Sequence, residues 1–330
     1  MSSTEGRIRL DKLYDDLRFK RQWLSEKFPS VSNAPLVLLT PMIVLFAIFL
    51  VFPVIFTLVL AFFRYQGVST DPLFVVNLGI SYIVVPRVVD LQFVGLQNFE
   101  RMLTDNVLHQ ALFNTVYLFA VLIPTMVIIP LTLAIALNSA LIRFRNTFRS
   151  LLLIPTAANT IAYSVVFIAI VAEGGLADSL FVLLGIDPIA WLQNGFWSRN
   201  LIAFMSVWRW TGYNMIIFLA GLQTIPQSLY EAAEIDGATR LQKFRYVTVP
   251  QLKPVLLFII VTSTISIFKK FAEPQILITS GAPLEETRTV VYYIYQVAFQ
   301  NLELGYGSAL TVLLVAIVTT MSLLQFRVAD

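Results

Sequence analysis

Residues 231–254 read EAAEIDGATRLQKFRYVTVPQLKP, a polar stretch that lies between two long apolar runs. Just before it, Thr224 and Gln227 have the spacing of a capping box, which predicts the start of a short helix. Gly237 is suited to a sharp bend after that helix, because glycine adopts backbone angles that other residues resist. A long polar segment inside an apolar chain favours a docking site for another protein.

A second short helix is predicted after the bend. Thr239 and Gln242 repeat the capping-box spacing, and the apolar residues that follow them give this helix one apolar edge. We expect Pro250 and Pro254 to end it, because proline has no backbone N–H to donate. The segment over residues 224–254 therefore reads as two helices joined at a glycine.

These residues resemble the EAA motif of binding-protein-dependent ABC importer permeases. The core of that motif is filled here by Glu231, Ala232, Ala233, Gly237, Val249 and Pro250. A fuller form, similar to the carbohydrate-uptake branch with its maltose, trehalose and glycerol-phosphate permeases, is filled by Asp236, Ala238, Phe244 and Pro254. The bland alternative is an amphipathic loop helix that only lies on the membrane.

Composition places the whole chain in a membrane. It is 57% hydrophobic and only 13% charged, which excludes an ordinary soluble domain. The Lys and Arg residues are scattered between apolar runs, so no nucleic-acid partner is expected. There is no cysteine for a disulfide framework or for thiolate chemistry, and no metal site is expected.

The predicted fold is an all-α integral membrane protein with about six transmembrane helices and a two-helix loop. A helix needs roughly 20 apolar residues to cross a bilayer. The expected spans are residues 35–63, 111–137, 151–172, 201–222, 255–279 and 308–326. A seventh apolar stretch, 73–89, contains Asn77, Pro86 and Arg87, and we interpret it as an external or interfacial segment.

The distribution of basic residues supports this topology. With six spans both termini share a side, and that side holds 15 of the 23 Lys and Arg residues, against five on the other side and three within spans. The positive-inside rule then makes that side cytoplasmic. We expect a charged leader over 1–34, either a short interfacial helix or a partly ordered tail, a permease domain over 35–327 and a tail over 328–330, with both termini cytoplasmic.

The resemblance extends along the chain and implies partners. Residues 93–99 are similar to the family's FVGLxNF segment, and 271–283 to its FxEPyxLTxGGP turn, where Ala282 replaces a glycine. The loop 66–92 has no counterpart in the pattern, and its role stays open. The family implies a second homologous permease subunit, two ATPase subunits and an extracytoplasmic solute-binding protein, in a cell membrane with its lipid.

No cofactor is expected in this chain. It contains no G-x-x-x-x-G-K-[ST] pattern, so nothing in it reads as a P-loop that cradles nucleotide phosphates. The resemblance implies that ATP and Mg²⁺ act on the partner ATPase subunits, and that this chain is a transport subunit and not an enzyme. A short helix held in a partner's groove would transmit their motion. The residues expected to contact the ATPase are Glu231 as the polar anchor, with Ala232, Ala233, Asp236, Gly237, Ala238, Leu241, Phe244 and Pro250.

Candidate solute contacts lie in the later spans. Ionisable groups inside a membrane are costly and usually face a cavity or a partner, and aromatic and amide side chains suit the ring faces and hydroxyls of a sugar. The candidates are Asn159, Tyr163, Arg209, Trp210, Tyr213, Asn214, Lys269, Lys270 and Glu273. The resemblance to the carbohydrate branch implies a sugar, or a sugar-like polyol or glycerol phosphodiester, as the solute. The aromatic and amide side chains give this weak physical support, and the cations leave a phosphorylated solute open. For each of these residues the alternative is a belt aromatic or a snorkelling lysine.

Three other classes remain as alternatives. An ABC permease for a non-carbohydrate solute would fit the same loop. An ion-coupled secondary transporter would need an internal repeat and broken helices, and no clear repeat relates the halves, although Pro124 and Pro130 interrupt the second span. An intramembrane enzyme has little support, because His109 is the only histidine and neither H-E-x-x-H nor G-x-S-x-G occurs.

Overall fold

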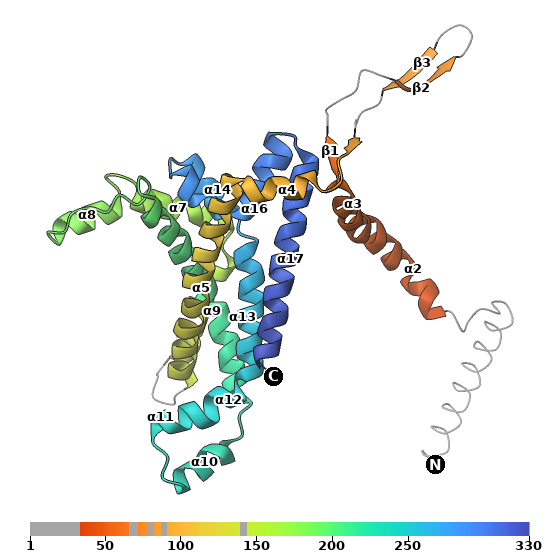
Figure 1. Cartoon of the computed structure of the whole chain (residues 1–330). Helices are drawn as coiled ribbons and strands as arrows, with labels where there is room; N and C mark the ends of the chain where they lie inside the picture. The colour runs from red at the N-terminus through yellow and green to blue at the C-terminus, as the bar shows by residue number, and fades with distance from the viewer. Residues whose placement is uncertain (1–33, 66–71, 78–81, 87–90, 139–143, 330) are drawn as a thin grey trace, which may run out of the picture. The chain divides into compact units, whose positions relative to one another are not determined.

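The computed structural model describes residues 34–65, 72–77, 82–86, 91–138 and 144–329 (Figure 1). They form two units, one up to Thr57 and one from Leu58 onward, which are described separately. Residues 1–33 of the expected leader lie outside the described residues. The tail expected at 328–330 begins inside the last helix, which ends at Ala329.

The first unit contains one long apolar helix. It consists of α2 (Ala34–Phe46), the π-helical turn η2 (Ala47–Val51) and α3 (Phe52–Leu60), whose last residues belong to the second unit. The rings of Phe52 and Phe56 lie about one turn apart and stack, with their centroids separated by 5.9 Å. This helix corresponds to the first expected span.

Two small antiparallel strand pairs open the second unit. Strand β1 (Phe63–Tyr65) pairs with β4 (Leu91–Phe93), and β2 (Pro72–Asn77) pairs with β3 (Tyr82–Pro86). The two inner strands fall within the apolar stretch 73–89, so its described residues are extended and do not form a membrane-crossing helix. This agrees with the prediction that the stretch 73–89 is not a seventh transmembrane span.

Helices α5 (Asn106–Asn138) and α9 (Gly195–Gln223) form the most extensive helix contact of the bundle. Helix α9 also packs on α6 (Arg145–Ala157), and at Gly212 the two helices are too close for a side chain on α9. A Cβ on Gly212 would lie only 1.8 Å from the carbonyl oxygen of Leu152. Glycine at this position therefore sets the spacing of the two helices.

The third expected span, 151–172, is divided into two helices. Helix α6 ends at Ala157, and α7 (Thr160–Val171) begins after a break. The side chain of Asn159 caps α7 by accepting a hydrogen bond from the backbone N–H of Ile161 at 2.9 Å. Helix α8 (Leu176–Leu183) follows and packs on α7.

The C-terminal part is also helical. Its elements are α13 (Lys253–Phe268), α14 (Ala272–Thr279), α15 (Leu284–Thr287), α16 (Val290–Tyr295), the π-helical turn η4 (Gln296–Gln300) and α17 (Leu304–Ala329). Apolar side chains from these helices join three buried clusters. Helix α5 contributes to all three, through Leu122, Leu108 and Leu131 respectively. It is therefore the central helix of the second unit.

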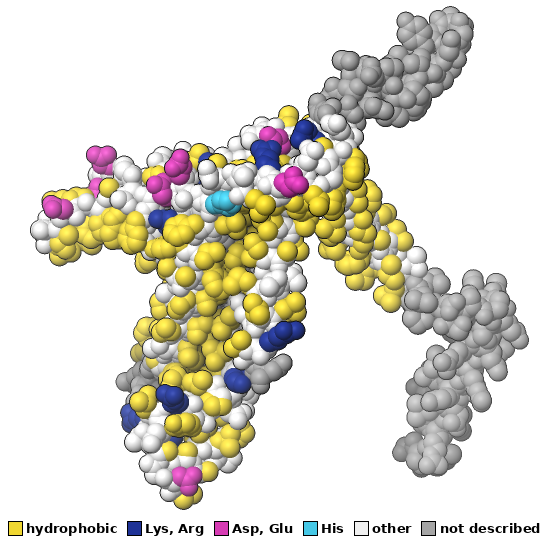
Figure 2. All heavy atoms as spheres, viewed as in Figure 1, with side chains coloured by type: hydrophobic (Ala, Val, Ile, Leu, Met, Phe, Trp, Pro, Cys, Tyr) yellow, Lys and Arg dark blue, Asp and Glu magenta, His cyan; other side chains and the backbone are white. Residues whose placement is uncertain are grey.

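Five described helical stretches are long and apolar enough to cross a membrane: 38–60, 106–138, 160–183, 253–279 and 304–328. The fourth expected span, 201–222, lies in α9, which is long enough but is not among the five. Arg199, Arg209 and several aromatic and amide side chains lower its hydropathy. The count of six stays a prediction. Figure 2 shows hydrophobic side chains over the helix surfaces and charged ones mainly toward the ends of the second unit.

A hydrogen-bonded carboxylate joins α4 (Gln97–Thr104) and α5 to the C-terminal helices. Asp105 accepts hydrogen bonds from the hydroxyls of Tyr293 at 2.6 Å and Tyr306 at 2.5 Å, and from the backbone N–H groups of Val107 and Leu108. Burial alone would raise the pKa of Asp105, but these hydrogen bonds outweigh it and hold the pKa below its ordinary value.

Candidate functional site

The polar loop folds as two helical segments joined at a bend. Helix α10 (Gln227–Ile235) ends at the bend, where Gly237 has a φ of +75°. Helix α11 (Arg240–Lys243) then continues into the π-helical turn η3 (Phe244–Thr248) and α12 (Val249–Gln251). The left-handed backbone at the bend confirms the reason given for a glycine there, because side chains with a Cβ rarely adopt it.

One of the two expected capping boxes is present. The backbone N–H of Thr239 donates to the Gln242 side chain at 2.7 Å, and the Gln242 N–H donates to the Thr239 hydroxyl at 3.4 Å. The box expected at Thr224 is wrong. That hydroxyl donates to the carbonyl oxygen of Gly221 at the end of α9, and α10 starts after Pro226 without a side-chain cap.

The expected helix ends at Pro250 and Pro254 are also wrong. Pro250 lies inside α12, directly after the wider π-helical turn, and Pro254 lies in the first turn of α13. A proline fits the first turn of a helix because the missing N–H would have no partner there. Only Leu252 separates the two helices, so the chain passes almost continuously from the loop into α13.

Four large apolar side chains of the loop are exposed, Leu229 at 38% and three others much more strongly. The exposed fraction is 87% for Ile235, 75% for Leu241 and 71% for Tyr246. Leu241 is a predicted contact residue, whereas the sequence pattern did not single out Ile235 and Tyr246. Ile235 could have been identified from the sequence, because it is an apolar residue that directly precedes the Asp-Gly bend of an otherwise polar loop. These side chains give the loop an apolar surface available to a partner.

The other predicted loop contacts are divided between the surface and the loop interior. Exposed residues are Glu231, Ala232, Asp236, Gly237 and Pro250, and partly buried residues are Ala233, Ala238 and Phe244. An ion pair between Lys243 and Glu234, with Nζ and Oε1 2.5 Å apart, joins the two helices of the loop. The Lys243 ammonium lowers the pKa of the exposed Glu234 carboxyl.

A buried ion pair lies where α13 gives way to α14. The Lys270 ammonium donates to Glu273 Oε1 at 2.8 Å, and the hydroxyl of Tyr163 on α7 donates to the same oxygen at 2.9 Å. All three side chains are buried, with exposed fractions of 7%, 5% and 4%. The structure thus brings together three of the predicted solute-pathway residues from two separate segments.

Arg209 lies beside this group. Its guanidinium carbon is 5.3 Å from the centre of the Tyr163 ring and 5.2 Å from that of Trp210, and its Nη1 donates to the hydroxyl of Thr160. A cation over aromatic faces is stabilised by the ring quadrupoles. Arg209 therefore connects α9 to the start of α7.

A cavity of about 200 Å³ adjoins the ion pair. Four predicted residues line it: Trp210, Tyr213, Asn214 and Lys270. Lining residues that were not predicted are Met126, Thr262, Ser263, Ser266 and Ile267. The small hydroxyl side chains were missed because Ser and Thr inside an apolar run also satisfy their own helix. Two predicted residues lie elsewhere: Asn159 is the cap of α7, and Lys269 is exposed.

Comparison with known proteins places this architecture in a family. Residues 106–330 match the family described as "Binding-protein-dependent transport system inner membrane component". The chain belongs to this family. The match covers the described bundle from α5 onward, including the two-helix loop and the cavity. Membership favours the ABC importer permease over the ion-coupled alternative.

Relatives of this permease transport saccharides according to their names. The lactose transport system permease protein LacF of Rhizobium radiobacter is 35% identical over 88% of this chain and 91% of its own length. The arabinooligosaccharides transport system permease protein AraP of Bacillus subtilis is 34% identical over 94% of this chain and 93% of its own length. These relatives are transport permease subunits, not enzymes.

A solved structure has the same fold. A chain of a bacterial alginate ABC transporter in complex with an alginate pentasaccharide-bound periplasmic protein superposes with a TM-score of 0.71. The alignment covers 95% of this permease and 96% of that chain, at 20% sequence identity. The membrane fold predicted from the sequence is thereby confirmed as that of an ABC importer permease, and it is mostly helical, with the strand pairs β1–β4 and β2–β3 as the exception among the described residues.

Proposed function

We propose that this permease carries a neutral sugar or short oligosaccharide into the cell and is driven by separate ATPase subunits. The observation that carries the solute assignment is the cavity next to the Lys270–Glu273 ion pair, taken together with family membership. Trp210 and Tyr213 offer aromatic faces there, and Asn214 and Ser266 offer hydrogen-bonding groups. Sugars present apolar ring faces and hydroxyls to such a lining.

Charge at the cavity favours a neutral solute over a phosphorylated one. Lys270 is the cation that lines the cavity, and its ammonium is already paired with Glu273 at 2.8 Å. Arg209 is turned toward aromatic rings and Thr160, and Lys269 is exposed. An anionic solute would have to compete with Glu273 for the ammonium. The names of LacF and AraP agree with a neutral saccharide, whereas two other relatives are named for sulfoquinovosyl glycerol and sn-glycerol-3-phosphate, so the choice of a neutral solute rests on the charge at the cavity.

The two-helix loop is the proposed contact with an ATPase. Ile235, Leu241 and Tyr246 would insert into an apolar cleft, and Glu231 would provide the polar anchor at the rim. The Lys243–Glu234 pair and the bend at Gly237 hold the two helices as one body. A rigid body of this kind transmits displacement, which biases the equilibrium between inward-open and outward-open states.

The remaining partners follow from the same proposal. A second homologous permease would complete the translocation pathway, two ATPase subunits would bind ATP and Mg²⁺, and an external binding protein would deliver the solute. The loop and both termini would lie in the cytoplasm, as the distribution of basic residues predicts. The alginate transporter, solved with a periplasmic protein, gives support for the external partner.

Reconstituted transport tests the proposal. The permease, its partner permease, the ATPase and the binding protein are placed in liposomes, and uptake of labelled lactose and arabinooligosaccharide is measured. We expect uptake with internal ATP and no uptake with an ion gradient alone. Uptake driven by the gradient without ATP would contradict ABC coupling. Tight binding of a peptide or an amino acid by the binding protein, with no sugar bound, would contradict only the solute class.

A loop variant tests the coupling contact separately. Ile235→Asp places a charge on the most exposed apolar side chain of the loop and should reduce co-purification of the ATPase. Arg245→Asp is the matched control, because Arg245 is also exposed on the loop but adds no apolar surface. Equal recovery of ATPase with both variants would exclude Ile235 from the contact.

A further inference from the structure

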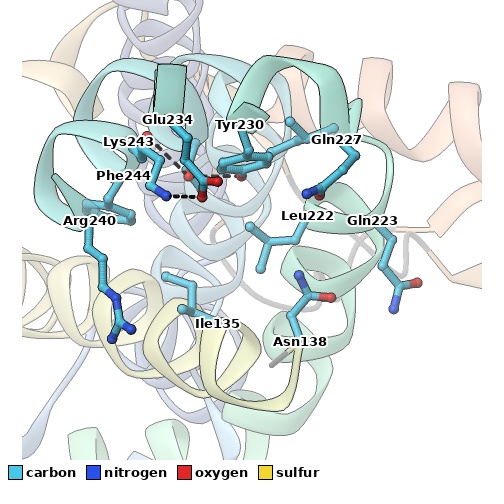
Figure 3. A pocket seen from close by; sticks show the side chains of 12 residues that line it. Ile135, Asn138, Leu222, Gln223, Gln227, Tyr230, Glu234, Arg240, Lys243 and Phe244 are labelled. Carbon is cyan, nitrogen blue, oxygen red and sulfur yellow. Dashed lines mark hydrogen bonds and ion pairs between the residues drawn. The ribbon is translucent and has the colours of Figure 1, made fainter. Parts of the chain in front are cut away.

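A second, larger cavity lies between the two-helix loop and the ends of two helices of the bundle (Figure 3). Its volume is about 1010 Å³. One wall is formed by α10 and α11, and the other by the C-terminal ends of α5 and α9. The cavity is separate from the one beside Lys270, because the two share no lining residue.

Four exposed polar side chains without a described protein partner line this cavity. The amides of Asn138, Gln223 and Gln227 and the guanidinium of Arg240 all line it. Within residues 34–65, 72–77, 82–86, 91–138 and 144–329, none of these four side chains makes a hydrogen bond or an ion pair with another protein group. Their donors and acceptors therefore remain available to a ligand.

The described lining carries a net positive charge. Arg240 and Lys243 are its cations, and Glu234, which pairs with Lys243, is its one carboxylate. The lining also includes apolar side chains, among them Leu222 of α9 and Phe244, which directly follows Lys243. A guanidinium binds phosphate through two parallel hydrogen bonds, amides bind hydroxyls, and an apolar wall packs against a sugar ring.

We propose that this cavity is a binding site for a small phosphorylated sugar or polyol. The phosphate would bind Arg240, because Lys243 is already paired with Glu234, and the hydroxyls would bind Asn138, Gln223 and Gln227. Such a ligand would bridge the loop and the ends of α5 and α9. The regulatory part of this inference rests on the proposed function: the ligand inhibits import by holding the loop in one position relative to the bundle.

Binding is tested on the purified transporter in detergent with glucose 6-phosphate as the probe. Isothermal titration should show saturable binding, with glucose and inorganic phosphate each at least about tenfold weaker, because each lacks part of the recognised chemistry. Arg240→Ala should weaken glucose 6-phosphate binding by about tenfold or more, and Gln227→Ala by less. Arg245→Ala, an exposed arginine of the same loop outside the cavity, is the matched control and should bind as the wild type does.

Three results would overturn the site. They are no saturable binding of glucose 6-phosphate, equal binding by Arg240→Ala and the wild type, or equal binding of glucose and glucose 6-phosphate. A lipid headgroup offers the same phosphate chemistry, so dihexanoyl phosphatidylglycerol is titrated in parallel. If this lipid binds through Arg240 and glucose 6-phosphate does not, the soluble ligand is excluded.

Regulation is measured apart from binding. Glucose 6-phosphate should lower solute-stimulated ATP hydrolysis of the wild-type complex and have no effect on the Arg240→Ala complex. Binding without inhibition would refute the regulatory role. Absence of sugar transport with binding intact would instead contradict the proposed function and leave the site in place.

Discussion

Neutralising one partner at a time of the buried ion pair at the junction between α13 and α14 should destabilise the permease strongly. In Lys270→Met the Glu273 carboxylate loses its cation, and in Glu273→Gln the ammonium loses its anion. Both side chains are buried, and their nitrogen and oxygen are 2.8 Å apart. Removal of one partner of a buried pair leaves an uncompensated charge, which costs about 3–5 kcal/mol of unfolding free energy.

Changing both partners together should restore most of that stability. Replacement of a buried pair by neutral side chains of similar volume is close to neutral, so the double variant should lose no more than about 1 kcal/mol. In the wild type the Tyr163 hydroxyl donates to the Glu273 carboxylate at 2.9 Å, and in Glu273→Gln the amide oxygen can accept the same hydrogen bond. The cost of the double variant should therefore be smaller than that of either single variant.

Unfolding of the purified transporter by sodium dodecyl sulfate in mixed micelles, followed by tryptophan fluorescence, gives these free energies. Lys269→Met is the matched control, because this neighbouring lysine is exposed, and it should change stability by less than about 0.5 kcal/mol. The reasoning is refuted if Glu273→Gln is as stable as the wild type. It is equally refuted if the double variant loses the sum of the two single costs, because the charges would then not stabilise each other.

Three further variants test the loop, the helix contact and the carboxylate at the start of α5. Gly237→Ala places a Cβ at a φ of +75° and should cost about 1–2 kcal/mol and lower solute-stimulated ATP hydrolysis, whereas unchanged coupling would show that the bend is not required. Gly212→Val should lower the thermal unfolding midpoint by several degrees, because its Cβ would lie 1.8 Å from the carbonyl oxygen of Leu152. An unchanged midpoint would show that α6 and α9 can move apart without loss of stability. Asp105 has a lowered pKa, so its contribution is complete above its unfolded pKa of about 3.9 and is lost as the pH falls through the folded value. Asp105→Asn should accordingly cost about 1–3 kcal/mol at pH 7 and flatten the acid dependence of unfolding, and an unaltered acid profile would assign that dependence to other groups.

Local chemistry explains which parts of the loop were predictable. The bend at Gly237 and the capping box of Thr239 and Gln242 involve residues within a few positions of each other, so their spacing is sufficient. Thr224 has the same spacing to Gln227, yet it follows α9 directly and its hydroxyl donates to the carbonyl oxygen of Gly221. A capping residue has this alternative whenever another helix ends immediately before it.

Tertiary pairing was not readable in the same way. Lys270 and Glu273 are only three residues apart, so their pairing is a local contact. The third member, Tyr163, lies on another helix, and 110 positions separate it from Glu273. No spacing rule relates such residues. The lining serines of α13 were missed for a related reason, since a hydroxyl within a helix also bonds to its own backbone.

The proposed coupling loop and the proposed solute cavity are joined by two helices. Helix α9 carries Trp210 and Tyr213 at the cavity and reaches the loop at Gln223, a rise of about 15 Å from Tyr213 at 1.5 Å per residue. Helix α13 leaves the loop at Lys253, directly after α12, and reaches the junction with Lys270. Because both are packed helices without a described break over these lengths, we expect a displacement of the loop to shift two walls of the cavity together. We expect the break between α13 and α14, where Lys270 and Glu273 pair, to absorb that displacement, because the helix does not continue through it.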